Sequence, residues 1–346
     1  MTEPPSEAPD AVAATPELTV QVLSWNTQRL TSEALDALDR DAPSFAREVL
    51  VLDNGSEDGT LDMLRARSGL RVLRSEENLG YARGHNLLAR EARGDFLCLL
   101  GSDTRVRPGT LDALVRFLLD HEDYGAAAPC LVDVRGVALR GDDVRGDEVS
   151  GGADRVQTAC MRFPTLRTAL VYDMFWRTWP LLRRFDAAYH YRDFDHLHDQ
   201  DVEQPPGTCL VLRRSLFAEL GGFDEELWLF FNDVDLCKRI HDRGLRIRYL
   251  SHVSVEHHEG ASTKAFGRRL VYWVQNRVAY YRKHHGRLGA GFVRLMTRLR
   301  AWQEWVAIGR RLDRKEDRRS ARAEVKRIVR EALSAGLSSK STGSST

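Results

Sequence analysis

Residues 48–60 read EVLVLDNGSEDGT, an apolar run that ends at Asp53 and passes into a polar turn before a helical pattern begins. The run predicts a buried strand, and the Asn-Gly and Asp-Gly pairs predict a tight connection to the next helix. The same order repeats around this segment, with apolar runs near 19–25, 48–53, 70–74 and 95–101 and helical patterns near 31–40, 59–67, 80–92 and 108–120. This alternation predicts an α/β fold with a Rossmann-like, mainly parallel, doubly wound sheet.

In such a sheet, ligands bind beyond the carboxyl ends of the strands, so polar residues that follow an apolar run are the first candidates for a site. Here these residues are Asn26, Asp53 and Asp103. Two interpretations stay open for Asp53. The segment after it is either a bare turn, or part of a nucleotide pocket in which the carboxylate accepts hydrogen bonds from a base and the glycines admit backbone N–H groups.

Asp103 follows the apolar run FLCLL, where a buried charge is costly unless something pairs with it. A divalent ion such as Mg²⁺ or Mn²⁺ is the natural partner. Such an ion needs only one or two protein carboxylates when diphosphate oxygens complete its shell. The alternative is that Asp103 caps the turn that leads to the helix after Pro108.

Two histidines end the β-rich run RYLSHVSVEHH. His257 has the same side-chain parity as Val253 and Val255, which predicts that it follows the core-facing side of the strand while His258 points the other way. One histidine is therefore expected to bind a metal. The competing interpretation makes His257 an ordinary core residue with satisfied hydrogen bonds.

Asp233 and Asp235 stand at a predicted helix start in NDVDLC. Residues two apart lie about 200° apart around a helix, so both carboxylates cannot face one reacting atom. At most one is catalytic, and the other is expected to pair with the helix dipole or with Lys238 or Arg239. Alternatively, Asn232 and both acids only cap the helix.

Bulk composition excludes some classes of protein. The 346 residues are 42% hydrophobic and 29% charged with a net charge of +1, which argues against nucleic acid as a partner. Five cysteines without CxxC spacing indicate buried free thiols in a reducing cytosol. No apolar run approaches the roughly 18 residues of a spanning helix. We therefore expect a cytoplasmic protein, or one attached to a membrane only at its inner surface.

The order and spacing of several motifs resemble the family 2 inverting glycosyltransferases of the GT-A fold, most closely their rhamnosyltransferase-like branch. The resemblance covers about residues 20 to 285. It is carried by DNGSEDGT (53–60), NLGYARGHN (78–86), SDT (102–104), GTCLVLRR (207–214), GGFDE (221–225), NDVDLC (232–237), HHEGAS (257–262) and NRVAYYRKH (276–284).

The resemblance implies that Asp53 contacts the nucleobase, that Asp103 and His257 hold Mg²⁺ or Mn²⁺, and that Asp233 is the catalytic base. The donor would be a nucleoside-diphosphate sugar, with dTDP or UDP as the nucleotide and rhamnose or another hexose as the sugar. The residues implied to bind it are Asn26, Asp53, Asn54, Ser56, Asn78, Gly80, Arg83, Asn86 and Ser102. Those assigned to the acceptor or the diphosphate are Glu203, Trp228, Asn232, Asp235, His258, Arg277 and Lys283.

Two positions depart from the family pattern. Gly101 stands where an Asp or Asn usually precedes the metal-binding aspartate by two residues, and Asn232 stands where the acidic pair usually begins. A second candidate is therefore a catalytically impaired relative that binds sugar nucleotides or acts as a scaffold. A sugar nucleotidyltransferase is a third, although the first strand lacks its Gly-rich, basic signature.

The predicted organisation has four parts. Residues 1–18 and 338–346 are expected to be disordered, and 19–263 to form the glycosyltransferase domain, divided into a nucleotide-binding half (19–130), a variable insertion (131–206) and an acceptor and catalytic half (207–263). Residues 264–337 are expected to form basic helices. From Gly286 onward there are 15 Lys and Arg against 6 Asp and Glu, an excess of 9.

The acceptor is expected to be a glycan, a lipid-linked sugar or a small molecule. The basic helices with Trp302 and Trp305, and the run around Phe175, Trp176 and Trp179, are compatible with peripheral contact to an anionic bilayer. A solvated helical face or a homodimer interface explains these residues equally well.

Overall fold

The computed structural model describes residues 16–134, 150–151, 154–172, 174–258, 268–312 and 314–334. Residues 1–15 and the tail 338–346, for which disorder was predicted, lie outside these ranges. The first strand begins at Leu18, which is fully buried, so the expected boundary of the N-terminal extension is one residue late.

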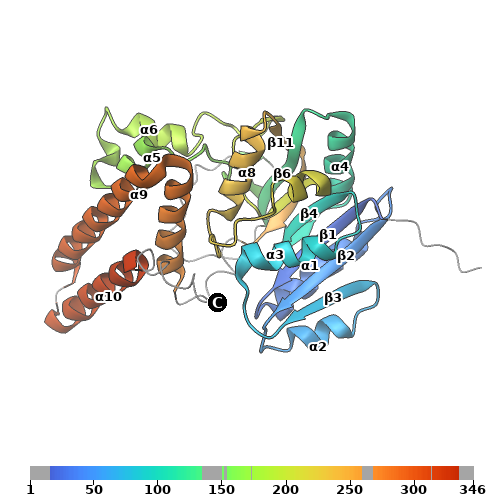
Figure 1. Cartoon of the computed structure of the whole chain (residues 1–346), viewed down its shortest axis with the longest axis horizontal. Helices are drawn as coiled ribbons and strands as arrows, with labels where there is room; N and C mark the ends of the chain where they lie inside the picture. The colour runs from blue at the N-terminus through green and yellow to red at the C-terminus, as the bar shows by residue number, and fades with distance from the viewer. Residues whose placement is uncertain are drawn as a thin grey trace, which may run out of the picture.

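One large mixed sheet forms the right-hand part of the molecule in the view of Figure 1, with the C-terminal helices to its left. Its main strands run in the spatial order β3-β2-β1-β4-β10-β6-β11-β5. The bounds are β1 Leu18–Ser24, β2 Arg47–Asn54, β3 Leu70–Ser75, β4 Phe96–Gly101, β5 Thr104–Val106, β6 Tyr124–Val134, β10 Cys209–Arg213 and β11 Arg246–His257, with short β7 Ser150–Gly151, β8 Asp154–Val156 and β9 Gln200–Asp201 at the side.

The four strands β3, β2, β1 and β4 are parallel, as the alternating pattern predicts. β10 lies between β4 and β6 and is antiparallel to both, while β11 is parallel to β6. The sheet is therefore mainly parallel in its first half and mixed beyond β4. Nothing in the local apolar pattern of Cys209–Arg213 reveals this reversal, because strand direction depends on the path of the chain.

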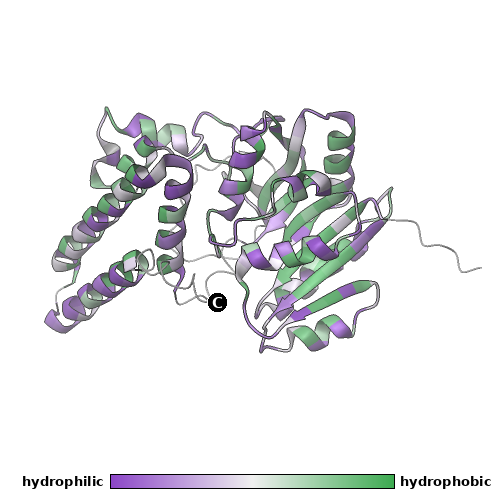
Figure 2. Cartoon of the chain, in the orientation of Figure 1, coloured by the Kyte–Doolittle hydropathy of each residue, from purple (hydrophilic) through white to green (hydrophobic). Residues whose placement is uncertain are grey.

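Helices cover both faces of the sheet. Strand side chains alternate, so Leu50 and Leu52 pack on one side and Val51 on the other. The face with Val51 is covered by α1 Gln28–Arg40, α2 Thr60–Arg65 and α4 Thr110–Asp120. The opposite face is covered by α3 Gly80–Glu91, α7 Arg214–Glu219 and α8 Asn232–Asp242. This arrangement confirms the doubly wound α/β prediction, and Figure 2 shows the strands as largely hydrophobic.

The C-terminal helices build a separate hydrophobic cluster beside the sheet (Figure 1). It joins buried residues of α9 and α10 to Ala169, Leu227 and Phe231. The elements in this part of the molecule are α5 Leu166–Val171, the 3₁₀ turn η1 Phe175–Thr178, α6 Arg183–Tyr189, α9 Arg269–Arg311 and α10 Lys315–Ser334. α9 bends at Gly286, which has φ 69° and ψ −173° and separates two helical halves.

Two further expectations can be compared with the described ranges. All five cysteines are buried and free, as predicted. Among the helices that the structure describes, none is both long enough and apolar enough to cross a membrane.

Candidate active site

Asp103 and His257 lie side by side where β4, β5 and β11 meet. β5 pairs antiparallel with the end of β11, and this register sets His257 opposite Thr104. Nε2 of His257 lies 3.9 Å from Oδ1 of Asp103, and the backbone N–H of His258 donates to the Asp103 carbonyl oxygen at 3.1 Å. Asp103 is buried. The structure thus brings together the two residues expected to hold a cation.

The His257 ring is held by Gln157, a residue that the sequence analysis missed. Nε2 of Gln157 donates to the His257 carbonyl oxygen at 2.9 Å, which directs its Oε1 toward His257 Nδ1, also at 2.9 Å. Because a carbonyl oxygen only accepts, Nδ1 of neutral His257 carries the proton and Nε2 presents its lone pair on the side of Asp103. Metal-binding histidines are typically oriented by such a second hydrogen bond.

The pair fits a divalent cation that is only partly held by protein. The 3.9 Å between its two atoms exceeds a hydrogen bond and is slightly less than two metal–ligand bonds of about 2.1 Å each. Within the described ranges, no group of three or more His, Cys, Asp or Glu side chains is placed to hold a metal ion. The remaining ligands of a cation here would therefore have to come from water or from a substrate.

Asp233 lies in the first turn of α8. Its Oδ2 accepts the backbone N–H of Gly207 at 3.0 Å, and its Oδ1 accepts that of Val234 at 2.9 Å. Burial raises the pKa of this carboxyl above its usual value, and the backbone hydrogen bonds offset only part of that increase. Asp233 makes no ion pair with any residue that the structure describes. It is therefore a carboxylate with an increased affinity for a proton.

Asp235 has the opposite environment. It is fully buried, and Arg239, Lys283 and His284 each approach one of its oxygens to 2.8 Å. Burial alone would raise its pKa, but the hydrogen bond with His284 and the charges of Arg239 and Lys283 outweigh it and lower the pKa to about 2. The predicted pairing with Arg239 is present, whereas Lys238 pairs with Asp242. Asp235 therefore joins α8 to α9.

A short backbone path connects the Asp103 turn to Asp233. The N–H of Gly101 donates to the carbonyl oxygen of Thr208 at 2.8 Å, and Thr208 follows Gly207, which binds Asp233. Tyr81, inside the 78–86 motif but not singled out from the sequence, donates its hydroxyl to the Gly207 carbonyl at 2.8 Å. The candidate base and the candidate metal ligands are thus attached to neighbouring segments rather than to unrelated surfaces.

Gly101 controls the space beside Asp103. A Cβ added there would lie 3.0 Å from Oδ1 of Asp103 and 2.9 Å from Oγ1 of Thr104. A side chain at this position would therefore point at the Asp103 carboxylate. Its absence leaves Asp103 as the carboxylate of the 101–103 turn.

Hydrogen bonds join the three loops that follow β1, β2 and β4 at the carboxyl ends of these strands. Asn26 donates its backbone N–H to Ser56 Oγ at 3.0 Å and accepts from the N–H of Glu57 at 2.8 Å. Ser102 Oγ accepts from the Thr27 hydroxyl at 3.3 Å. These contacts place Asn26, Ser56 and Ser102 at one edge of the sheet, where the sequence predicted a ligand.

Two polar atoms in the loops after β2 and β3 have no partner among the described residues. Asp53 is buried at the end of β2, and its Oδ1 accepts the N–H of Ser56 at 3.2 Å while Oδ2 has no hydrogen bond. Asn78 Oδ1 accepts from Asn54 Nδ2 and from the Gly80 N–H, both at 2.9 Å, while its Nδ2 has no hydrogen bond. The loop pair therefore offers one unused acceptor and one unused donor.

The remaining residues of the 78–86 motif serve different purposes. Gly80 has φ +78°, and an added Cβ would overlap the indole of Trp228 at 2.5 Å. Arg83 is exposed. Both ends of the Asn86 amide are used, because Nδ2 donates to the Phe223 carbonyl at 2.9 Å and Oδ1 accepts the Phe223 N–H at 2.8 Å. Asn86 thus braces the 221–225 turn, and its contact with the sugar donor stays a prediction.

The acceptor-side candidates are scattered over the C-terminal half. Glu203 pairs with Arg162, and Lys283 is already paired with Asp224 and Asp235. Nδ2 of Asn232 donates to the Leu229 carbonyl at 2.9 Å and its Oδ1 accepts the Asp233 N–H at 2.8 Å, so Asn232 shapes the first turn of α8. Nε2 of His258 is buried and has no hydrogen-bond partner among the described residues.

Arg277 is a buried guanidinium among aromatic rings. Its carbon Cζ lies 5.2 Å from the ring centres of both Tyr172 and Trp273. Among the described residues, its Nη2 has no hydrogen-bond partner and no carboxylate lies within ion-pair distance. It lines a cavity of about 10 Å³ together with Phe231, two residues from Asp233. Such a volume admits about one water-sized atom.

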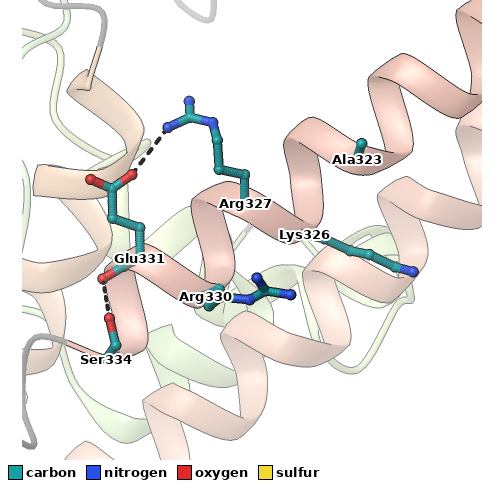
Figure 3. Close-up of a pocket in the computed structure, with 6 residues that line it drawn as sticks. All are labelled: Ala323, Lys326, Arg327, Arg330, Glu331 and Ser334. Carbon is teal, nitrogen blue, oxygen red and sulfur yellow. Dashed lines mark hydrogen bonds and ion pairs between the residues drawn. The ribbon is translucent and has the colours of Figure 1, made fainter.

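A larger hollow of about 380 Å³ lies elsewhere, along α10 (Figure 3). It is lined by residues of that helix alone: Ala323, Lys326, Arg327, Arg330, Glu331 and Ser334. None of these residues belongs to the Asp103, His257 and Asp233 region, so the hollow is an open groove of the basic surface and not part of the candidate site.

Comparisons with known proteins agree with this geometry. The sequence profile of the family described as "Glycosyltransferase like family 2" matches residues 16–276. An N-acetylglucosaminyl-diphospho-decaprenol L-rhamnosyltransferase of Mycobacterium tuberculosis is 28% identical over 227 residues, 62% of this chain and 67% of that protein. An uncharacterized glycosyltransferase, YfnE of Bacillus subtilis, is 40% identical over 114 residues, 32% of this chain and 28% of that protein.

Two solved structures share the fold. The mannosyltransferase PcManGT of Pyrobaculum calidifontis, in complex with GDP-Man and Mn²⁺, superposes with a TM-score of 0.51 over 95% of this chain and 89% of that chain, at 16% identity. GalNAc-T7 with UDP, GalNAc and Mn²⁺ has a TM-score of 0.52 over 77% of this chain and 48% of that chain, also at 16% identity. At this identity the similarity establishes the common α/β architecture.

Proposed function

This chain belongs to glycosyltransferase like family 2 and has the GT-A fold, and we propose that it transfers a sugar from a nucleoside diphosphate to an acceptor hydroxyl with inversion at the anomeric carbon. The observation that carries this proposal is the contrast between two acids on one helix. Asp235 is neutralised by three bases, whereas Asp233 has a raised pKa and a backbone connection to the Asp103 turn.

Asp233 acts as the general base in this proposal. The acceptor oxygen forms its bond to the anomeric carbon while the bond to the diphosphate oxygen breaks, the bonding pair leaves with the diphosphate, and the hydroxyl proton passes to Asp233. A base with a raised pKa removes such a proton more readily, and general bases typically contribute on the order of 10²–10⁴ in rate. Asn232 cannot accept the proton, but its hydrogen bond to the Asp233 N–H helps to fix the helix start.

Asp103 and His257 are the residues that would hold Mg²⁺ or Mn²⁺. A cation bound there would neutralise negative charge on the departing diphosphate. Gln157 keeps the His257 lone pair available, and Thr208 fixes the turn of Gly101 and Asp103 relative to Asp233. Neither basic residue expected at the diphosphate is open to it in this structure, because Lys283 is paired with two carboxylates and Arg277 is buried beside a cavity of about 10 Å³.

The unused atoms of the donor loops favour a uridine or thymidine nucleotide. Oδ2 of Asp53 requires a hydrogen-bond donor and Nδ2 of Asn78 requires an acceptor. A uracil or thymine ring offers an N–H flanked by two carbonyl oxygens, which satisfies both needs. We therefore propose a UDP- or dTDP-sugar, with rhamnose among the sugars to test because the Mycobacterium relative is a rhamnosyltransferase.

For the acceptor we propose a lipid-linked or glycan hydroxyl on the cytoplasmic side of a membrane. The relative's name contains a diphospho-decaprenol acceptor, and the free buried thiols suit a reducing compartment. The division into a nucleotide-binding half (19–130), an insertion (131–206), a catalytic half (207–263) and basic helices (264–337) remains our proposal for how these tasks are distributed.

A panel of nucleotide sugars tests the proposal. Thermal shift with and without Mn²⁺ should reveal stabilisation by one uridine or thymidine sugar, and release of nucleoside diphosphate should follow when an acceptor is added. Binding without turnover would favour the impaired relative that Gly101 and Asn232 suggest. If no nucleotide sugar changes the melting temperature in either condition, the proposed donor site is wrong.

A further inference from the structure

The second half of α9, residues 287–311, carries an exposed apolar stripe. Leu288, Leu295 and Trp302 are 91%, 49% and 62% exposed. Residues seven apart differ by only about 20° around a helix, so these three side chains share one face. The first half of α9 differs, because its Val271, Tyr280 and Tyr281 are fully or almost fully buried. Figure 2 shows hydrophobic residues interspersed with hydrophilic ones along the outer half of α9, away from the sheet.

A second exposed apolar segment adjoins this stripe. Phe175, Trp179 and Leu181, in and after η1, are 58%, 54% and 67% exposed. The backbone N–H of Phe175 donates to Oε1 of Gln303 at 3.3 Å, and Nε2 of Gln303 lies 3.8 Å from Sδ of Met174. These contacts fix η1 next to Trp302. We call the combined surface the aromatic platform; it consists of Phe175, Trp179, Leu181, Leu288, Leu295 and Trp302.

The charges around the platform are mainly positive. Exposed arginines on the same segments are Arg183, Arg184, Arg287, Arg298, Arg310 and Arg311. Arg287, Arg298 and Arg310 form no ion pair within the described part of the chain. The acid on this half of α9, Glu304, is already engaged by Arg300 and Arg311. The platform is therefore a cationic surface with a hydrophobic centre.

We propose that the aromatic platform docks the enzyme on an anionic phospholipid bilayer, with the second half of α9 lying in the interface. Tryptophan, phenylalanine and leucine enter the acyl boundary of a bilayer while arginines meet lipid phosphates, so both components of the surface are satisfied at once. A second copy of the chain fits less well, because a two-fold contact would bring two copies of the same cationic surface together. Membrane docking does not require sugar transfer, so an experiment can support or reject it independently of the proposed function.

Docking in this way has a consequence for the active site. Lys283 and His284, just before the Gly286 bend, bind Asp235 on α8, the helix that carries Asp233. The platform half of α9 is therefore connected through one bend to the helix of the proposed base.

Vesicle flotation with the full chain, without any substrate, tests the proposal. The two probes are vesicles of phosphatidylcholine alone and vesicles of equal parts phosphatidylcholine and phosphatidylglycerol. The wild type should float with the anionic vesicles only, and Leu295→Ser combined with Trp302→Ser should reduce the bound fraction about tenfold or more. Leu119→Ser is the matched control, because Leu119 on α4 is 55% exposed but lies outside the platform.

A charge variant, Arg287→Gln with Arg298→Gln, should also weaken flotation and reduce its dependence on salt. The docking proposal is overturned if the wild type stays in the soluble fraction with anionic vesicles, or if the apolar double variant floats as well as the control. It is equally overturned if sedimentation shows a dimer that the double variant dissolves while no vesicles bind. Transfer to a soluble acceptor by the same variants reports on the sugar chemistry separately.

Discussion

Asp233 is anchored by Gly207, whose backbone N–H lies 3.0 Å from the carboxylate Oδ2. This bond joins the start of α8 to the segment before β10, and through Thr208 to the Asp103 turn. This hydrogen bond explains why Asp233 can keep one orientation although no cation in the described ranges pairs with it.

Replacing Asp233 with Asn should abolish transfer without unfolding the protein. Loss of the base should reduce kcat by about 10²–10⁴ while donor affinity is retained. Burial favours an uncharged side chain here, but Asn can accept only one of the two backbone N–H groups that Asp233 accepts, so the variant should remain folded with a stability close to that of the wild type at pH 7. Asp242→Asn, on the surface of the same helix, should keep full activity. Full turnover by the Asp233 variant would exclude Asp233 as the base.

Asp235→Asn should have the reverse effect and primarily reduce stability. It leaves Arg239, Lys283 and His284 around a side chain without charge, which should cost on the order of 3 kcal/mol in unfolding free energy. Denaturant titration measures this loss, with Asp242→Asn again as the control. A variant as stable as the wild type would show that the three bases are not held by Asp235.

The same carboxyl predicts how stability depends on pH. Its pKa falls from 3.8 to about 2 on folding, so the ionised form stabilises the fold at every pH above about 4. That contribution, about 2 kcal/mol, should disappear as the pH falls from 4 toward 2. Urea titrations across this window should show a smaller acid destabilisation for Asp235→Asn than for the wild type. Parallel curves for the two proteins would contradict the assignment.

The cation site makes a prediction about two histidines on one strand. His257→Ala should abolish the stabilisation of the protein by Mn²⁺ plus donor, whereas His252→Ala, which removes an exposed contact with Asp199, should not. Gln157→Ala should weaken Mn²⁺ binding about 10- to 100-fold, because it frees the His257 ring. Calorimetry measures both effects. Equal Mn²⁺ affinity in all four proteins would place the cation elsewhere.

Asp53→Asn should weaken the binding of uridine or thymidine nucleotides. The variant replaces the carboxylate, whose Oδ2 is an unused hydrogen-bond acceptor, with an amide that also carries an NH₂ donor. Loss of the charge-assisted hydrogen bond to the base should reduce nucleotide affinity about 10- to 100-fold. The control is Asp58→Asn, since Asp58 accepts from Thr60 and Gln28 at the start of two helices and its loss should affect stability instead. Unchanged nucleotide affinity in the Asp53 variant would remove Asp53 from the donor site.

Much of the fold could be predicted because its information is local. The strand-turn-helix pattern around Asp53 marks a parallel unit, and its repetition marks the sheet. The proximity of Asp103 and His257 was also predictable, since each residue ends an apolar run and lies in a motif of the resembled family. The pair of Asp235 with Arg239 followed from their position on one helix.

Other features could not be predicted because they depend on contacts between distant segments. Gln157 lies in an irregular stretch without any period, yet it sets the tautomer of His257, one hundred positions later in the chain. The sequence predicts Lys283 as a cation for the diphosphate, whereas α9 brings it to Asp235 on α8. The reversal of β10 depends on the path through residues 135–206, part of which lies outside the described ranges.

That reversal has a consequence for how the enzyme can vary. Because β10 runs against β4, its amino end lies at the edge where the parallel strands finish, and it supplies an N–H there where a parallel neighbour would supply a carbonyl. A deletion or insertion of one residue in this five-residue strand would exchange its two faces and carry Gly207 away from α8. Homologues should thus differ freely in the length of the preceding insertion while keeping this strand at constant length.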